Sequence, residues 1–231
     1  MLPWEAVKNY AVFPRDLLYQ YRDLSLRARC FLRLRWYLTF FERIKKELPE
    51  KGTVLDIGCG YGLFSLFLAM TRNDEVFGFD PDQTRIADAK RLEAKFSNLY
   101  FTTDLENGAL YRQNIITIID VLYLLPDSEK RRMLKSAYVK LRPGGTLLLK
   151  INGKEPYWKY VIAYVEEWIM TRMGPTVNSG TLHFWDAKSY NELLEDIGFN
   201  MVSSEIIHSF LPQSHHLIVA KKPSTSHGED L

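Results

Sequence analysis

Apolar and polar residues follow two different periods along the chain, and the change falls near residue 53. From there, short apolar runs alternate with longer amphipathic segments, which is typical of an α/β fold with a mainly parallel sheet. The runs predict strands at Thr53–Ile57, Glu75–Phe79, Leu99–Thr102, Ile115–Ile119 and Thr146–Ile151. The segments between them predict helices at Leu63–Thr71, Gln83–Lys95 and Ser128–Leu141, the last capped by Asp127.

Residues 1–50 have a helical pattern instead. Phe31, Leu34, Leu38 and Phe41 recur at helical spacing and predict one buried face. The stretch Leu48–Gly52 then interrupts the pattern as a linker would. We therefore expect a helical N-terminal extension over residues 1–50, which would cover the main domain as a lid.

The chain after residue 151 is less regular. We predict helices at Tyr157–Met173 and Ala187–Ile197, followed by an antiparallel strand pair at Met201–His208 and His216–Ala220. The main domain would span residues 51–221. Residues 222–231 contain too few apolar side chains to pack and are expected to be a disordered tail.

Length and composition limit the possible classes of protein. The 231 residues suit one large domain with an extension, and 46% hydrophobic and 25% charged residues exclude collagen-like, low-complexity and coiled-coil chains. Cys30 and Cys59 show neither disulfide-scaffold nor zinc-ligand spacing, so no metal site is predicted. No signal or membrane-spanning segment is evident, and the pattern favours a cytoplasmic protein.

The net charge of +2 gives no general reason to expect nucleic-acid binding. Residues 22–46, however, carry a local charge of +6 together with several aromatic residues. Three interpretations remain open for this segment: a packed lid with solvated arginines, a helix that lies peripherally on a membrane or lipid surface, and an RNA contact. The first is favoured, and nucleic acid is the least expected partner.

A glycine-rich loop follows the first predicted strand. Asp56, Gly58, Gly60 and Gly62 form the pattern D-x-G-x-G-x-G at the point where a helix begins. Glycines let the backbone turn tightly and approach a ligand, and the start of a helix favours an anionic group. A dinucleotide fold would need G-x-G-x-x-G, but its third glycine would fall at position 63, which is Leu63.

The loop resembles the first motif of class I S-adenosylmethionine-dependent methyltransferases, and the resemblance continues through residues 53–151. It implies a Rossmann-like fold, with a seven-stranded, mostly parallel sheet, an antiparallel last strand and helices on both faces. It also implies S-adenosylmethionine as the cofactor. The turn Leu141–Gly145 before the fifth strand agrees with this family.

The resemblance assigns further cofactor contacts to the ends of the next strands. Asp80 matches the acid that binds both ribose hydroxyls, and Asp104 matches the acid that accepts from the adenine amino group. Asp120 begins a segment similar to the family's fourth motif, beside the reactive methyl. The complete predicted cofactor set is Asp56, Gly58, Cys59, Gly60, Tyr61, Gly62, Asp80, Pro81, Asp82, Thr103, Asp104, Leu105, Asp120, Val121 and Leu122.

The catalytic group is harder to identify, because methyl transfer depends largely on holding the acceptor in line with the methyl. Tyr123 and His183 are the candidates, since Tyr can orient an acceptor hydroxyl and His has a suitable pKa range for a base. For both, a packing or loop role is the stronger interpretation. His215 and His216 are expected to be sheet residues that point to opposite faces.

We expect a methyltransferase that acts on a small, apolar, aromatic or lipid-like acceptor. Residues 1–50 and 152–185 would supply specificity, because both are rich in aromatic side chains. An RNA or protein substrate and a catalytically silent cofactor-binding domain are the alternatives. The oligomeric state is not indicated by the sequence.

Overall fold

The computed structural model describes residues 15–152, 183–207 and 215–224. The predicted helix Tyr157–Met173 and its aromatic residues lie outside these ranges, as do residues 1–14, 208–214 and 225–231.

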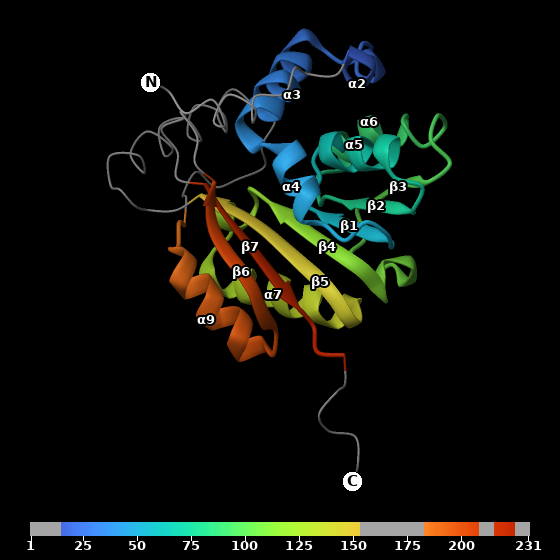
Figure 1. Ribbon diagram of the computed structural model, residues 1–231. Helices are drawn as coiled ribbons and strands as arrows, with labels where there is room; N and C mark the ends of the chain where they lie inside the picture. Colours follow the sequence, from blue (N-terminus) through green and yellow to red (C-terminus); the bar gives the residue numbers. More distant parts are fainter. Residues whose placement is uncertain (1–14, 153–182, 208–214, 225–231) are drawn as a thin grey trace.

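Seven strands form one sheet in the described part of the chain, in the order β3-β2-β1-β4-β5-β7-β6 (Figure 1). The first five strands are mutually parallel, and β7 pairs antiparallel with both β5 and β6. The strands are β1 (Val54–Ile57), β2 (Val76–Phe79), β3 (Leu99–Thr102), β4 (Gln113–Ile119), β5 (Leu141–Asn152), β6 (Asn200–Ile207) and β7 (His215–Lys221). The predicted fold class is confirmed.

The chain direction across the sheet reverses between β1 and β4. From β1 the chain proceeds outward to β2 and β3, then returns to β4 on the other side of β1 and continues to β5. The loops that follow β1 and β4 therefore diverge at the carboxyl edge of the sheet. In open α/β sheets such a switch point is where ligands bind.

Helices cover both faces of the sheet (Figure 1). One face packs against α5 (Leu63–Thr71), α6 (Gln83–Lys90) and the N-terminal helices. The other packs against α7 (Asp127–Lys140) and α9 (Ala187–Ile197). Because successive side chains of a strand point to opposite faces, β5 contributes Leu148 to the first core and Leu147 and Leu149 to the second.

The N-terminal segment folds into three helices: α2 (Arg15–Gln20), α3 (Leu26–Thr39) and α4 (Phe41–Glu47). Helix α3 buries Ala28, Leu32, Trp36 and Thr39. The predicted buried face was wrong, because Leu34 is 42% exposed and Phe41 belongs to the next helix. Phe40 causes this change: its left-handed backbone (φ 58°) ends α3 and redirects the chain into α4.

Several predicted boundaries also move. The helix expected at Gln83–Lys95 ends at Lys90. Asp127 is the first residue of α7 and Pro126 is its N-cap, so Asp127 does not cap it. Residues 141–145, expected as a turn, begin β5, since Leu141 pairs with Gln113.

The described part of the predicted tail is bonded to the rest of the domain. The Lys222 N–H donates to the Gly145 carbonyl at 2.9 Å, and the Lys222 ammonium donates to the carbonyls of Tyr138 and Leu141. Ordered contacts therefore continue past β7 by at least one residue.

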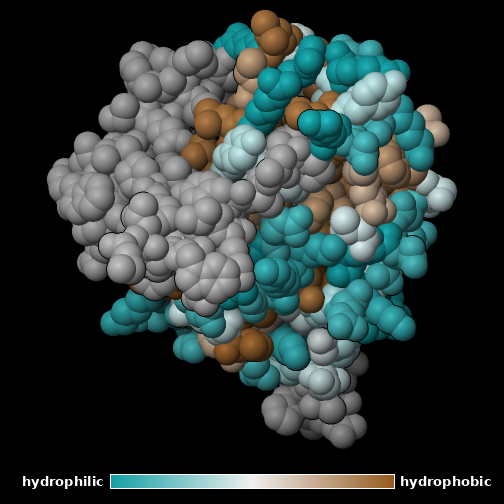
Figure 2. All heavy atoms as spheres, turned by 45° about the horizontal axis from the view of Figure 1, so that its top comes forward, coloured by the Kyte–Doolittle hydropathy of each residue, from teal (hydrophilic) through white to brown (hydrophobic). Residues whose placement is uncertain are grey.

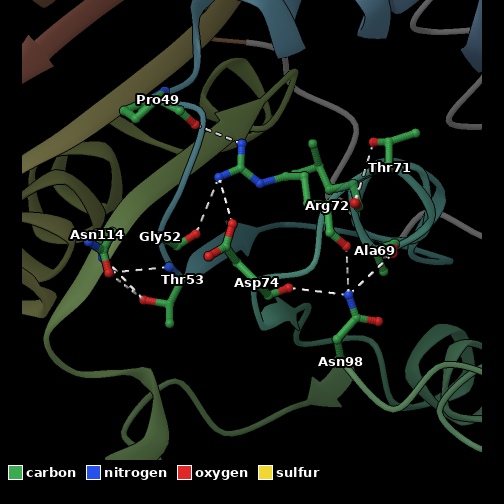
Figure 3. A network of polar contacts seen from close by, with 10 residues as sticks. Pro49, Gly52, Thr53, Ala69, Thr71, Arg72, Asp74, Asn98 and Asn114 are labelled. Carbon is green, nitrogen blue, oxygen red and sulfur yellow. Dashed lines mark hydrogen bonds and ion pairs between the residues drawn. The ribbon is translucent and has the colours of Figure 1, made fainter.

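A polar network fixes the amino edge of the sheet (Figure 3). The Arg72 guanidinium donates to the carbonyls of Pro49 and Gly52 and pairs with Asp74. The Asn98 amide donates to three backbone carbonyls that surround the end of α5. Thus the linker between α4 and β1 is held in place by side chains from elements that are distant in sequence.

No helix in the described ranges has the length and apolar character needed to cross a bilayer.

Trp36 should be a main anchor of α3. Its buried ring makes edge-to-face contacts with Phe41 at 5.5 Å and with Phe67 of α5 at 5.2 Å. We expect Trp36→Ala to lower the free energy of unfolding by about 3–5 kcal/mol, through lost burial and a cavity. Urea denaturation measures this effect. Tyr37→Ala, at a neighbouring position that is 42% exposed, is the control and should change stability by about 0.5 kcal/mol or less.

Candidate functional site

The glycine loop joins the carboxyl end of β1 to α5. The N–H groups of Gly58 and Cys59 both donate to the Phe79 carbonyl at the end of β2, at 2.7 and 3.0 Å. The Gly62 N–H donates to the Cys59 carbonyl at 2.9 Å, which closes a tight turn. Burial raises the pKa of the Cys59 thiol well above its usual value, so this side chain stays a neutral packing group.

The glycines at positions 60 and 62 serve different purposes. A Cβ on Gly62 (φ 75°) would lie 2.4 Å from the Phe101 ring, so glycine permits close packing there. A Cβ on Gly60 (φ 58°) would meet no described atom within 4 Å. Among the described residues, the loop therefore presents uncovered backbone at Gly60, which fits a backbone-bound ligand such as the methionine part of the expected cofactor.

Asp80 connects this loop to the end of β2. One of its carboxylate oxygens accepts from the Gly60 N–H at 2.9 Å, and the other accepts from the Asp82 N–H at 3.0 Å. The carboxyl is buried, and desolvation raises its pKa while the two hydrogen bonds lower it. An ionised carboxylate can accept about four hydrogen bonds, so two further donors can be accommodated.

Asp82 and Pro81 continue from Asp80 into α6. Asp82 is the N-cap of that helix and accepts from the N–H groups of Thr84 and Arg85, while Pro81 is exposed. The capping role that Asp82 has here accounts for its position without a ligand.

Asp104 follows β3 with Thr103 and Leu105. Both Thr103 and Asp104 are exposed, and Asp104 accepts from the Glu106 N–H at 2.9 Å in a turn. Since β3 pairs with β2, Asp104 and Asp80 follow neighbouring strands at the same edge of the sheet. This placement agrees with adjacent parts of one ligand.

Asp56 lies inside β1 and is buried. Its two oxygens accept from the hydroxyls of Ser65 (α5) and Thr117 (β4), at 2.7 and 2.9 Å. Burial raises its pKa to about 6, and the two hydroxyls offset part of that increase. Asp56 thus ties β1 to β4 and α5 beneath the glycine loop, with both oxygens already hydrogen-bonded.

Asp120 follows β4 and is the centre of a buried polar cluster. Its carboxylate accepts from the Lys150 ammonium at 2.5 Å and from the Thr39 hydroxyl at 3.3 Å, and it lies 3.4 Å from the Arg35 guanidinium. Lys150 also donates to Asn152, whose side-chain oxygen lies 3.0 Å from Nδ1 of His215. We call these six residues the Asp120 cluster.

Sequence reasoning missed most of the Asp120 cluster. Lys150 is a visible signal, because it is a charged residue inside the apolar run Leu147–Ile151. Charge in a buried strand requires a partner, and this could have suggested Asp120. His215 and His216 are in β7 as expected, and His215 points to the face that α3 covers.

The two catalytic candidates lie together. The His183 N–H donates to the Tyr123 carbonyl at 2.8 Å, and the Phe184 ring stacks on the Tyr123 ring with centroids 5.0 Å apart. Leu122 and Tyr123 are buried in a short 3₁₀ helix (Leu122–Leu124), while His183 is partly exposed. Lys130 fixes the segment further by donating to the His183 carbonyl at 2.6 Å.

The N-terminal helices contact the glycine loop directly. Tyr61 is buried beneath them, with the Phe31 ring at 6.2 Å and the Tyr21 hydroxyl donating to the Tyr61 carbonyl at 3.1 Å. Together with Arg35 and Thr39, these contacts bring α3 to both loops of the switch point.

Comparison with protein families gives a match over most of the chain. A family model described as a methyltransferase domain matches residues 27–204, and so includes most of α3.

Curated relatives cover the same region at modest identity. A phosphoethanolamine N-methyltransferase from Triticum aestivum is 26% identical over 168 residues, which are 70% of this chain and 31% of that protein. A carboxy-S-adenosyl-L-methionine synthase from Alteromonas mediterranea is 27% identical over 130 residues, 51% of each chain. The chain thus spans between about a third and a half of these relatives.

Solved structures share the fold. An S-adenosylmethionine-dependent methyltransferase from Methanosarcina mazei superposes with a TM-score of 0.60 at 23% identity, covering 78% of this chain and 97% of that one. One from Mesorhizobium loti gives 0.61 at 15% identity, covering 81% and 97%. The [4+2]-cyclase SpnF gives 0.63 at 16% identity, covering 82% and 84%.

Asp56 should make stability depend on pH. Its folded-state pKa of about 6 lies above the ordinary value of 3.8, so the folded protein binds this proton more tightly than the unfolded chain does. The resulting stabilisation is complete below about pH 4 and is lost as the pH rises through 6. Relative to Asp56→Asn, the wild-type unfolding free energy should fall by about 2.5 kcal/mol between pH 4 and 7.

Urea denaturation of both proteins across this pH range, without added ligand, measures the difference. Asn can keep both hydroxyl contacts, because Ser and Thr hydroxyls donate and accept. The control is Asp23→Asn, whose carboxylate is exposed and should give a pH profile parallel to that of the wild type. A constant difference between wild type and Asp56→Asn would contradict the assignment.

Proposed function

The chain belongs to the class I S-adenosylmethionine-dependent methyltransferase family, and we propose that it transfers the methyl group of that cofactor to a small, apolar, aromatic or lipid-like acceptor. The observation that carries the proposal is the hydrogen bond from the Gly60 N–H to Asp80, at a glycine whose Cβ position meets no atom of the described residues. A buried carboxylate and bare loop backbone meet there, at the switch point of the sheet.

The residues that would hold the cofactor follow the ends of four strands, β1, β2, β3 and β4. We assign the methionine part to the loop Gly58–Gly62, above the support that Asp56 provides. Asp80 would accept from the ribose hydroxyls, with Pro81 and Asp82 alongside. Asp104 would accept from the adenine amino group, while Thr103 and Leu105 would flank the ring, and Asp120, Val121 and Leu122 would face the reactive end.

The bound cofactor supplies an activated methyl group on a sulfonium, and the protein's task is to hold the acceptor in line with it. Such positioning can contribute ~7–11 kcal/mol to lowering the barrier. We propose that Tyr123 helps to orient the acceptor, because stacking on the Phe184 ring holds the Tyr123 ring in place. His183, partly exposed and bonded to Tyr123 through its backbone, is the candidate base for an acceptor that must lose a proton.

Two observations support a small acceptor. The Triticum aestivum relative is named for phosphoethanolamine, a small molecule. Phe31 of α3 also lies beside Tyr61 of the glycine loop, with ring centroids 6.2 Å apart, whereas Trp36 and Phe41 are buried in the core. RNA or protein substrates and a catalytically silent domain remain as the competing proposals.

Peripheral contact with an anionic membrane through residues 22–46 stays a prediction. Leu26 and Tyr37 of α3 are 71% and 42% exposed, and Arg22 and Arg27 are exposed as well. Hydrophobic residues also lie among hydrophilic ones on the surface that Figure 2 turns toward the viewer. Exposed apolar and basic side chains of this kind suit a headgroup surface.

Asp80→Ala should weaken S-adenosylmethionine binding roughly 10- to 100-fold, because charge-assisted hydrogen bonds to the ribose and the anchor of Gly60 are both lost. Isothermal titration calorimetry measures the affinity. Asp88→Ala, on the neighbouring helix α6, serves as the matched control and should bind like the wild type. Equal affinities for Asp80→Ala and wild type would refute the ribose assignment.

The acceptor class is tested by methyl transfer in a cell extract. Purified protein, labelled S-adenosylmethionine and extract are incubated, and the extract is then separated into small molecules, lipid, RNA and protein. The proposal expects label in the small-molecule or lipid fraction. Label in RNA or protein would support the competing enzyme proposal, and cofactor binding without label in any fraction would support the silent domain.

A further inference from the structure

The Asp120 cluster joins the end of β4 to the N-terminal helix α3. The side chains of Asp120 and Lys150 are 3% and 1% exposed, and their ion pair spans the neighbouring ends of β4 and β5. On the opposite oxygen of Asp120, Arg35 and Thr39 approach from two successive turns of α3. The Arg35 guanidinium also donates to the Ile119 carbonyl at 3.4 Å, so α3 contacts both side chain and backbone here.

The backbone of Asp120 is in an unusual conformation. Its φ of 56° lies in the left-handed region, which non-glycine residues adopt uncommonly. Such strain persists only where surrounding contacts hold it. The contacts from Lys150, Thr39 and Arg35 provide that restraint, so they determine the direction in which the chain leaves β4.

That direction matters for the glycine loop, because Val121 is the next residue. Val121 lies so close to Gly58 that a Cβ there would be 2.3 Å from its Cγ2 atom. A displacement of Asp120 would therefore move Val121 against, or away from, the first glycine of the loop. The same helix α3 also contacts the loop through Phe31 and Tyr61.

We propose that Arg35 and Thr39 are positioning residues for the cofactor loop, which act through Asp120 by holding Val121 against Gly58. Helix α3 then helps to position the cofactor loop in addition to packing over it. The choice of S-adenosylhomocysteine as the test ligand rests on the proposed function. The coupling from α3 through Asp120 and Val121 to Gly58 rests only on the contacts described above.

The test compares two arginines of the same helix. Arg35→Met removes the contact with Asp120, and Arg33→Met removes an exposed arginine with the same change in charge and size. S-adenosylhomocysteine is titrated into each full-length protein by calorimetry. We expect Arg35→Met to bind about tenfold more weakly than wild type, and Arg33→Met to bind within about twofold of it.

A double-mutant cycle shows whether the effect passes through Asp120. If it does, the double variant Arg35→Met/Asp120→Asn should have about the same affinity as the single variant that binds more weakly. The reason is that each substitution breaks the same contact between Arg35 and Asp120. Fully additive losses would overturn the proposed route. Should Arg35→Met fail to fold, Thr39→Val replaces it, because it removes one hydroxyl at nearly constant volume and should weaken binding about threefold.

Hydrogen exchange without ligand gives a readout that is independent of binding. Faster exchange at residues 58–62 and 120–124 is expected in Arg35→Met but not in Arg33→Met. If wild type does not bind S-adenosylhomocysteine, the proposed function fails while exchange still tests the link. If wild type binds and the two arginine variants match it in affinity and exchange, the positioning proposal is overturned.

Discussion

A buried carboxylate needs hydrogen bonds or opposite charge, and three such groups determine how the carboxyl edge of this sheet is built. Asp56, Asp80 and Asp120 lie in or just after three neighbouring strands, and each is compensated differently. Asp56 uses hydroxyls, Asp80 uses backbone N–H groups, and Asp120 uses a buried ammonium together with a guanidinium and a hydroxyl. Each form of compensation recruits another element, and together they link the glycine loop, α5, α6, β5 and α3.

These contacts change how the basic N-terminal extension is interpreted. The favoured interpretation of its local charge of +6 is a packed lid with solvated arginines, yet one of these arginines, Arg35, reaches Asp120. Tyr21 and Phe31 meanwhile fix the extension to Tyr61 in the glycine loop. The basic segment therefore has two sides: an inner one that packs on the glycine loop and Asp120, and an outer one, with Leu26 and Tyr37, that is exposed.

The fold and family limit the chemistry without naming the acceptor. Structures with this fold include methyltransferases and a [4+2]-cyclase, so similarity of architecture alone does not identify a reaction. We propose that members differ in the side chains around the reactive end of the cofactor. The candidates in this chain are the Asp120 cluster, Tyr123 and the segment 183–185, which lie near the end of β4.

The sequence by itself determined the sheet, most of its helices, the glycine loop and the position of Asp80 just after β2, because these features depend on local periodicity and short spacings. It could not determine which face of α3 is buried, since Phe40 adopts a left-handed conformation that no local pattern signals. Nor could it pair Asp120 with Thr39, 81 positions away, or with Arg35 and Lys150. Those pairings were decided by the tertiary structure, because burial obliges a charged group to bind whichever partners the packing of distant elements brings within reach.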